Sequence, residues 1–302
     1  MRIGIDLGGS HVGVGLVEED GKILVKKEYN LLVKEKQRVQ EVIIDKIVQF
    51  VNEILDENHH ILENMKQIGI ASPGTVKDGK LYHLVNLNID EFDITEKLNE
   101  YFNIPIKICN DAKCAAIAEN LYGSMKSYED HIFLTIGTGI GGAAFYNHQM
   151  LVPKQNPGFE FGHMIIQKDG NVCKCGKQGC FESYCSIKAL KKQVTSYLEL
   201  EPDISGKELR KLIEENIQDP GLDEILERYV EYLSIGLSNL INIFEPQAIG
   251  IGGSFAHYEE LLLERLKERL YRKDLLFNKN DVVEIRLATL QNDAGIIGAA
   301  ML

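Results

Sequence analysis

Residues 1–17 read MRIGIDLGGSHVGVGLV, and residues 131–146 read HIFLTIGTGIGGAAFY. In each stretch apolar residues alternate, a glycine-rich run follows, and the alternation resumes, which indicates two antiparallel strands joined by a tight turn. The two stretches begin about 130 residues apart, a period too long for a solenoid repeat. The recurrence therefore predicts an internal duplication with two related β-rich halves.

The rest of the chain mixes strands and helices. Residues 23–29 extend the first hairpin into a three-strand meander, and the apolar spacing in 38–58 predicts a helix. Further strands are expected at 66–71, 104–109, 247–251 and 282–288, and further helices at 112–122, 187–244 with breaks near Pro202 and Pro220, 257–271 and 293–301. Residues 147–185 are irregular. Because no low-complexity linker separates the halves, we expect a hinge near 110–130.

The composition is that of an ordinary globular protein. The chain has 302 residues, of which 44% are hydrophobic and 26% charged, which suits two domains. No run approaches about 18 apolar residues, and the N-terminus enters a strand without a signal-peptide pattern, so we expect a cytoplasmic protein without a membrane partner. The formal net charge of -12 disfavours nucleic acid as a partner.

The two glycine turns are candidate phosphate-binding sites. The residues concerned are Asp6, Gly8, Gly9 and Ser10 in the first turn and Gly137, Thr138 and Gly139 in the second. Glycine lets backbone N–H groups approach an anion, and Asp6 can hold Mg²⁺ through water. Neither turn is a P-loop or a dinucleotide-binding fingerprint, because each leads into a strand. A single turn of this kind favours a hairpin with glycine at positive φ, whereas the repeated pair favours phosphate binding.

A compact group of metal-binding residue types follows. It comprises His163, Cys173, Cys175 and Cys180. One imidazole and three thiolates match a closed, tetrahedral structural zinc site, whose filled coordination leaves no open position for catalysis. The alternative is three buried free thiols beside a histidine. Cys109, Cys114 and Cys185 lack such spacing and are interpreted as packed thiols.

These motifs together resemble the ROK family of repressors, open reading frames and sugar kinases. The resemblance rests on CKCGKQGCFE at 173–182 after a Gly-His pair, DLGGS at 6–10, NDA at 110–112 before an alanine-rich helix, and GIIGAA at 295–300. It implies an α/β, two-domain actin-like ATPase (RNase H-like) fold with a cleft between the domains, and a homodimer. We expect an N-terminal domain at 1–115, on which 290–302 packs back, and a larger C-terminal domain at 116–289 with a zinc loop at 158–185.

The resemblance also implies transfer of the γ-phosphate of ATP, with Mg²⁺, to the 6-hydroxyl of a hexose. Asp111 matches the catalytic base of the family, although an aspartate before a helix is equally typical of an N-cap. The positions that match sugar contacts are Gly74, Asn86, Asn110, Asp111, Glu160, His163 and Glu182, and Gly252 and Gly253 match an adenosine-side turn. From the residues alone, each glutamate could equally be a solvated loop charge.

The sugar is not decided by the sequence. Phe159 stands where the family commonly has glycine, and His11 and Lys113 also depart from the usual pattern. Glucose is the first expectation; fructose, mannose, allose, N-acetylmannosamine and N-acetylglucosamine are alternatives. A repressor of the family would carry a preceding DNA-binding domain, for which the position of Asp6 leaves no room. A non-catalytic sugar sensor is disfavoured by Asp111, and a chaperone-type ATPase of this fold is disfavoured by the zinc loop.

Overall fold

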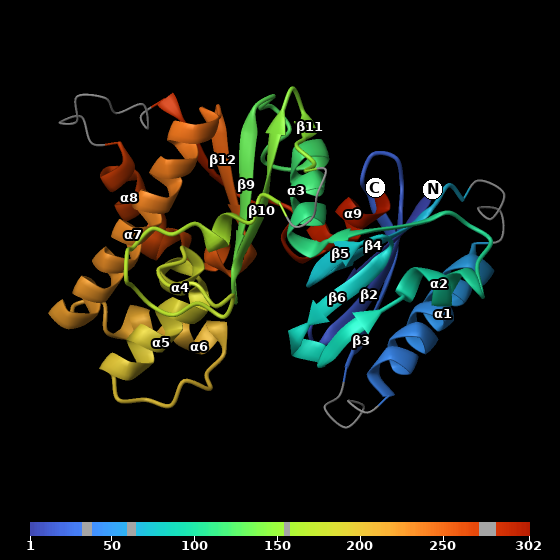
Figure 1. The fold of residues 1–302 in the computed structure, drawn as a ribbon, viewed down its shortest axis with the longest axis horizontal. Helices are drawn as coiled ribbons and strands as arrows, with labels where there is room; N and C mark the ends of the chain where they lie inside the picture. Colours follow the sequence, from blue (N-terminus) through green and yellow to red (C-terminus); the bar gives the residue numbers. More distant parts are fainter. Residues whose placement is uncertain (32–37, 59–64, 154–157, 272–281) are drawn as a thin grey trace. The chain divides into compact units, whose positions relative to one another are not determined.

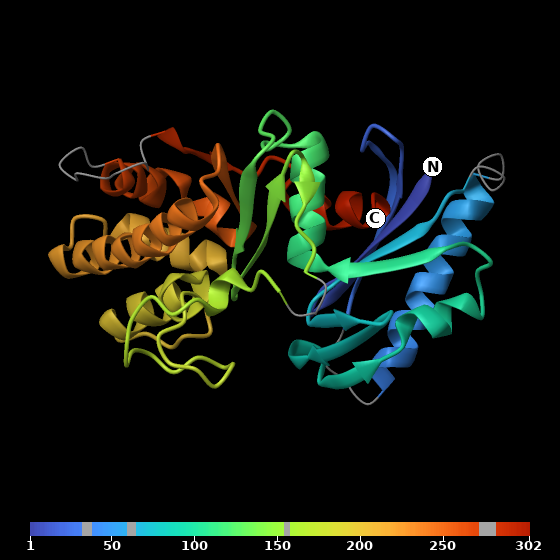
Figure 2. The ribbon, with the colours of Figure 1, turned by 45° about the horizontal axis from the view of Figure 1, so that its top comes forward.

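The structure, a computed structural model, describes residues 1–31, 38–58, 65–153, 158–271 and 282–302. The chain forms two compact units. The first unit comprises Met1–Lys126, Val152–Gly158 and Thr289–Leu302, and the second comprises Ser127–Leu151 and Phe159–Ala288. Each unit is built on its own five-stranded sheet (Figures 1 and 2).

The sheet of the first unit confirms the predicted meander. Its strands are β1 (Arg2–Leu7), β2 (His11–Val17), β3 (Ile23–Asn30), β4 (Ile68–Ser72) and β8 (Ile106–Asn110). They follow the order β3-β2-β1-β4-β8, in which β1 to β3 are antiparallel and β4 and β8 run parallel to β1. Asp6 pairs with Ala71, and Ser72 pairs with Asn110. The carboxyl ends of the three parallel strands therefore meet at one edge of the sheet.

Helices cover both faces of this sheet. The helices α1 (Val39–Glu57), predicted from the sequence, and α2 (Ile94–Asn99) share a hydrophobic core with the Ile3 and Ile5 side chains. The helices α3 (Asp111–Tyr122) and α9 (Ala294–Ala300) pack against each other, and α9 lies on β1 and β4. A Cβ on Gly4 or Gly69 would lie 2.0 or 1.7 Å from a carbonyl oxygen of α9. Glycine at these strand positions therefore lets α9 sit directly on the sheet.

A second, smaller sheet in this unit has no counterpart among the sequence predictions. It comprises β5 (Thr75–Lys77), β6 (Lys80–Leu84) and β7 (Ile89–Phe92), in the order β5-β6-β7, with the short helix η3 (Val85–Leu87) between the last two strands. These strands are short and alternate only briefly, so their pattern is too weak to be detected without the pairing. They present Asn86 toward the first glycine turn.

The sheet of the second unit repeats the topology of the first. Its strands are β9 (His131–Ile136), β10 (Ile140–Tyr146), β11 (Gln149–Met150), β12 (Ala248–Gly252) and β13 (Glu284–Leu287). The order is β11-β10-β9-β12-β13, again three antiparallel strands followed by two parallel ones, as the internal duplication predicts. The expected turn over 137–142 is too long, because Gly141 and Gly142 already pair with Thr135 and Leu134 inside β10.

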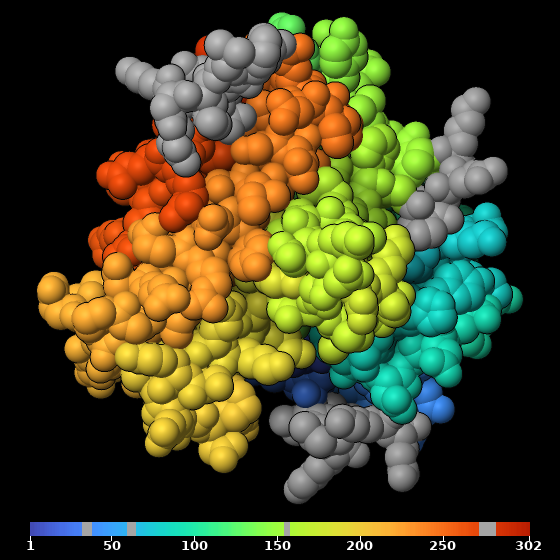
Figure 3. All heavy atoms as spheres, turned by 60° about the vertical axis from the view of Figure 1, so that its left-hand side comes forward, coloured from blue at the N-terminus to red at the C-terminus, as the bar shows by residue number. Residues whose placement is uncertain are grey.

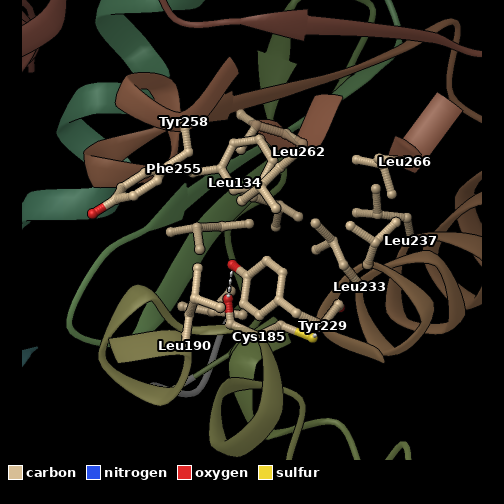
Figure 4. Packing of buried hydrophobic residues seen from close by; sticks show 14 of the residues in the cluster. Leu134, Cys185, Leu190, Tyr229, Leu233, Leu237, Phe255, Tyr258, Leu262 and Leu266 are labelled. Atoms are coloured by element: carbon tan, nitrogen blue, oxygen red, sulfur yellow. Dashed lines mark hydrogen bonds between the residues drawn. The ribbon is translucent and has the colours of Figure 1, made fainter. Parts of the chain in front are cut away.

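Helices fill one side of the second unit. They are α4 (Glu182–Cys185), α5 (Ile187–Tyr197), α6 (Gly206–Glu215), α7 (Pro220–Phe244) and α8 (Glu259–Leu270). The expected breaks occur, and Pro220 begins α7, where its missing N–H costs nothing. The core joins Leu134 of β9 to Leu233 of α7 and Leu266 of α8 (Figure 4). The buried Tyr229 hydroxyl is satisfied by the Cys185 carbonyl oxygen at 2.7 Å.

The domain limits expected from the sequence stay a prediction. The expected limit after residue 115 falls inside α3, which continues to Tyr122 and lies as a whole in the first unit. Helix α9, within the expected segment 290–302, also belongs to the first unit. Within the described ranges, no helix combines the length and the apolar character needed to cross a bilayer.

Candidate functional site

The first glycine turn joins β1 to β2 beside Asp6. The Gly8 N–H donates to the His11 carbonyl oxygen at 2.9 Å. A Cβ on Gly8 would lie 2.3 Å from the His11 ring, and one on Gly9 would lie 2.9 Å from the Asn86 side chain. Neither glycine has a positive φ. The alternative of a turn that uses glycine for positive φ is therefore wrong here, and close packing by His11 and Asn86 is what requires glycine.

Negative charge concentrates at this end of the sheet. The Asp6 carboxylate lies 3.6 Å from Nε2 of His11, and its interaction with the imidazole raises the pKa of His11. A Cβ on Gly295 would approach the Asp6 carboxylate to 2.7 Å, so the start of α9 leaves room for that side chain. The Ser10 hydroxyl is exposed beside it. The charge of Asp6 also acts on Asp111, which makes this edge suited to a bound cation.

Asp111 is the first residue of α3, and Asn110 is its N-cap. The Asn110 Oδ1 accepts the N–H groups of Ala112 at 3.1 Å and Lys113 at 3.4 Å. The Nδ2 of the same side chain donates to the Gly74 carbonyl oxygen at 3.3 Å. The N-cap alternative for Asp111 therefore applies to its neighbour. Asp111 uses one oxygen, Oδ1, to accept the Ala112 N–H at 2.7 Å, which leaves Oδ2 for other contacts.

The Asp111 carboxyl has a raised pKa. Desolvation by the surrounding protein is the first cause and the charge of Asp6 adds to it, whereas the hydrogen bond from the Ala112 N–H acts in the opposite sense. The Asp111 residue also remains exposed to solvent, so its desolvation is partial. A carboxylate with raised basicity at a helix start is suited to accept a proton from a bound hydroxyl.

The second glycine turn follows β9 and contacts Glu182. The Gly137 N–H donates to the Gly139 carbonyl oxygen at 2.9 Å, and the Thr138 side chain is exposed. A Cβ on Gly139 would lie 2.7 Å from Oε2 of Glu182. The same Oε2 accepts the Ile140 N–H at 3.3 Å. The turn and the glutamate are thus held together as one structure.

Gly252 and Gly253 end β12 next to this turn. Gly252 pairs with Thr135 near the end of β9, so both glycine segments lie at the carboxyl ends of adjacent parallel strands. A Cβ on Gly252 would lie 2.8 Å from the Phe133 ring. Gly253 has a φ of 71°, which favours glycine, and begins the short helix η5 (Gly253–Tyr258). Ligands of parallel α/β sheets bind at such strand ends.

The four predicted metal ligands converge. Their ligand atoms all lie within 4.8 Å of one another. The Sγ atoms of Cys175 and Cys180 are 3.6 Å apart, and Nδ1 of His163 is 3.7 Å from Sγ of Cys173. Tetrahedral zinc with Zn–S bonds of about 2.3 Å places sulfurs about 3.8 Å apart. The donor set and its spacing therefore fit a closed zinc site.

Backbone geometry brings the three sulfurs together. Gly176 and Gly179 have φ values of 87° and 80°, and a Cβ on Gly179 would lie 1.8 Å from the Gln167 carbonyl oxygen. Short bridges pair Val172 with Gln178 and Ile165 with Cys180. The loop itself lies on the surface of the second unit, in yellow-green in Figure 3. A metal ion would tie down a segment that has little hydrophobic core of its own.

Glu182 links the histidine–cysteine cluster to the second glycine turn. Its Oε1 lies 3.4 Å from Sγ of Cys173 and 3.9 Å from Nδ1 of His163, while Oε2 meets the turn. The sequence predicted that the metal cluster fixes this carboxylate. It did not predict the contact with the second glycine turn, because that contact joins segments more than 40 residues apart.

Phe159 adopts a backbone conformation that is rare for a residue with a side chain. Its φ is 59°, in the left-handed region. Its ring lies 6.2 Å from the Phe161 ring and 6.3 Å from the Phe244 ring, between centroids, and Phe161 and Phe244 meet edge to face at 5.8 Å. The aromatic cluster holds the strained residue in place. This φ explains why glycine is the residue typical of the position, immediately before Glu160, whose side chain is exposed.

The predicted site residues fall into two sets, one in each unit. The first unit contains Asp6, Gly8, Gly9, Ser10, Gly74, Asn86, Asn110 and Asp111, and the second contains Gly137, Thr138, Gly139, Glu160, His163, Cys173, Cys175, Cys180, Glu182, Gly252 and Gly253. Packing or hydrogen bonds connect the first set through Gly9–Asn86 and Asn110–Gly74. The sequence pattern did not predict the contact between His11 and Asp6, although both flank the same turn.

Comparison with known proteins decides the family. The model of the ROK family matches residues 2–302. The chain belongs to the ROK family. Its two-domain actin-like ATPase fold is that of ROK sugar kinase structures.

This ROK chain is similar both to kinases and to repressors. A glucokinase of Halalkalibacterium halodurans is 29% identical over an alignment of 313 residues, gaps included, which covers 99% of this chain and 94% of that protein. A xylose repressor of Bacillus spizizenii is 30% identical, over 89% of this chain and 68% of the repressor. The crystal structure of a ROK family glucokinase from Streptomyces griseus in complex with glucose and AMPPNP is 26% identical, with a TM-score of 0.77 over 99% of this chain and 98% of that one.

Proposed function

We propose that this ROK protein is an ATP-dependent sugar kinase that phosphorylates the 6-hydroxyl of a hexose, with glucose as the first candidate. The observation that carries the proposal is Asp111, a carboxyl of raised pKa at the start of α3 with Oδ2 left for other contacts. It lies where the parallel strands of the first unit end, beside the first glycine turn and Asp6. Glucokinases of similar sequence and fold support the reaction class.

Asp111 acts as the general base. It accepts the proton of the sugar 6-hydroxyl as the sugar oxygen forms its bond to the γ-phosphorus and the bond from that phosphorus to the bridging oxygen breaks, releasing ADP. The capped start of α3 holds the carboxylate rigidly, because Asn110 accepts the N–H groups of Ala112 and Lys113. The raised pKa increases its basicity.

The glycine turns meet the phosphates. Backbone N–H groups of Gly9, Ser10, Thr138 and Gly139 provide donors, and the exposed Ser10 and Thr138 hydroxyls provide two more. Gly8 and Gly137 shape the two turns, because their own N–H groups donate to carbonyl oxygens within them. Gly252 and Gly253 form the adenosine side. Asp6 would hold the Mg²⁺ that accompanies ATP, since its carboxylate adds to the negative charge around Asp111. When bound, Mg²⁺ neutralises charge on the phosphates.

The sugar hydroxyls are bound by polar groups. The proposed contacts are Asn86, Asn110, Asp111, the backbone at Gly74, Glu160, His163 and Glu182. His163 faces the cysteines through Nδ1, which leaves Nε2 for the sugar. His163, Cys173, Cys175 and Cys180 would hold Zn²⁺, which orders the loop that bears Glu182 and supplies no reactive position. The homodimer stays a prediction, which light scattering on the purified protein would check.

A sugar-responsive regulator is the second candidate, because the repressor match is as strong in identity as the glucokinase match. Fructose, mannose, allose, N-acetylmannosamine and N-acetylglucosamine are the alternative substrates of a kinase. The two functions differ in one property. A regulator binds its sugar without releasing ADP from ATP.

The test is ADP release from Mg-ATP with a panel of glucose, the five alternative sugars and xylose. We expect release with one or a few hexoses, and an about 10³-fold lower kcat in Asp111→Asn with unchanged sugar binding by calorimetry. Asp45→Asn, an exposed aspartate on α1, is the matched control and keeps full activity. Sugar-independent ADP release, or full activity of Asp111→Asn, refutes the mechanism. Sugar binding without any ADP release supports the regulator.

A further inference from the structure

Glu119 is a fully buried carboxylate near the C-terminal end of α3. Among the described residues it forms no ion pair with a lysine, arginine or histidine. Burying an ionised carboxylate is costly unless hydrogen bonds replace its water. The donors that surround Glu119 therefore indicate what this charge does in the fold.

Five donors surround the two carboxylate oxygens. Oε1 accepts the N–H groups of Thr289 at 2.8 Å and Leu290 at 2.7 Å. Oε2 accepts the Ser124 N–H at 2.7 Å, the Ser124 hydroxyl at 3.0 Å and the Thr289 hydroxyl at 3.3 Å. Each oxygen thus meets at least one backbone N–H.

These donors lie where the chain passes between the two units. The first long segment of the first unit ends at Lys126, two residues after Ser124, and the chain re-enters that unit for the last time at Thr289. The Glu119 carbonyl oxygen also accepts the N–H groups of Gly123 and Met125 at 3.1 and 3.2 Å. A Cβ on Gly123 would lie 2.0 Å from Oε2, so glycine is needed there. One residue therefore fixes the chain beside its first exit from the first unit and at its last return to it.

The same helix carries Asp111 at its other end. Eight residues separate Asp111 from Glu119, about 12 Å along an α-helix. The helix is held against α9 by close backbone packing, because a Cβ on Gly298 would lie 1.8 Å from the Cys114 carbonyl oxygen. Displacement of the clamped segments would therefore move a rigid element that ends at Asp111.

We propose that Glu119 is a positioning residue for phosphoryl transfer. It clamps the segments beside two of the four chain crossings, at Ser124 and at Thr289, to α3 and thereby fixes these segments relative to Asp111. The kinetic part of this inference rests on the proposed kinase function. The clamp requires a carboxylate. In Glu119→Gln, an NH₂ group replaces one of the two carboxylate oxygens. Because each oxygen accepts a backbone N–H, the NH₂ group faces a backbone N–H donor in either orientation of the amide, and at least one hydrogen bond is lost.

The test uses Glu119→Gln in the full chain, with hydrogen exchange as the first readout. We expect exchange at the amides of Ser124, Thr289 and Leu290 to rise about 10- to 100-fold, with unchanged exchange in β1 and β9, which reports that only the clamp has opened. We expect kcat to fall about tenfold, with calorimetric sugar affinity within threefold and a stoichiometry of one site per folded chain. The stoichiometry separates a positioning defect from a loss of folded protein.

A second variant covers the case in which Glu119→Gln fails to fold. The double variant Ser124→Ala, Thr289→Val keeps the carboxylate and removes the two hydroxyl donors, and should raise exchange at the three amides about tenfold and lower kcat about threefold. Unchanged exchange refutes the clamp, and raised exchange with unchanged kcat refutes the positioning role. A wild-type protein without kinase activity refutes the proposed function instead, and exchange alone then decides the clamp.

Discussion

Phe159 offers a test in which backbone strain and side-chain packing act in opposite directions. Its φ of 59° costs a residue with a Cβ about 1–2 kcal/mol, a cost that glycine does not have. At positions without this strain, glycine lowers stability by about 0.5–1 kcal/mol relative to alanine, because it loses more backbone conformational entropy on folding. Replacing Phe159 by alanine keeps the strain and replacing it by glycine removes it. We therefore expect Phe159→Gly to be more stable than Phe159→Ala by about 0.5–1 kcal/mol.

Both variants should be less stable than the wild type. Each loses the ring contacts with Phe161 and Phe244, and aromatic pairs of this kind contribute about 0.5–1.5 kcal/mol each. Urea unfolding followed by circular dichroism gives the free energies of unfolding. Tyr146 is the matched control, since it is an exposed aromatic residue of β10 in the same unit without a positive φ. At this position, where φ is not positive, we expect Tyr146→Gly to be less stable than Tyr146→Ala.

The same pair of variants tests the role of Phe159 in the sugar site. Glycine frees the backbone before Glu160, so Phe159→Gly should raise KM for the sugar several-fold and leave KM for ATP nearly unchanged. If Phe159→Gly is less stable than Phe159→Ala by the margin found at Tyr146, the strain argument is wrong. If the sugar KM is unchanged in both variants, Phe159 does not position Glu160.

Three further predictions follow from charged and metal-binding groups. Asp111→Asn should lose activity, but its free energy of unfolding at pH 7 should stay within about 1 kcal/mol of the wild-type value. Because the pKa of Asp111 is raised in the folded state, the wild type should lose stability relative to the variant as pH rises through that pKa. The opposite pH trend in thermal unfolding would contradict the assignment. Burial lowers the pKa of His131 from 6.5 to about 4. The free energy of unfolding of the wild type should therefore fall by up to about 3 kcal/mol relative to that of His131→Phe as pH decreases from 6.5 to 4. Above pH 7, urea titrations should show the same pH dependence of stability for both proteins. Treatment with a chelator, with metal removal verified, should weaken sugar binding about tenfold and ATP binding less, measured by calorimetry. Equal losses of both affinities, or no loss of either, would refute a role for the metal in the sugar site.

Local patterns determined much of this protein. The duplicated hairpins follow from alternation on either side of a glycine turn, and the two sheets have matching topology. The convergence of the cysteines follows from their spacing in the sequence, because three cysteines within eight residues can converge only through a tight loop with glycines at positive φ. These features depend on residues close in sequence, so their physical cause is contained in short segments.

Tertiary structure alone decided the contacts between distant segments. The sequence could not show that glycine at positions 4 and 69 allows α9 to pack directly on the sheet, or that Asn86 requires glycine at position 9. In both cases the cause is an atom from a distant segment. Nor could the sequence distinguish Glu119 from a solvated glutamate. Its burial is tolerated only because donors at Ser124 and Thr289, the latter 170 residues away, converge on its oxygens after folding.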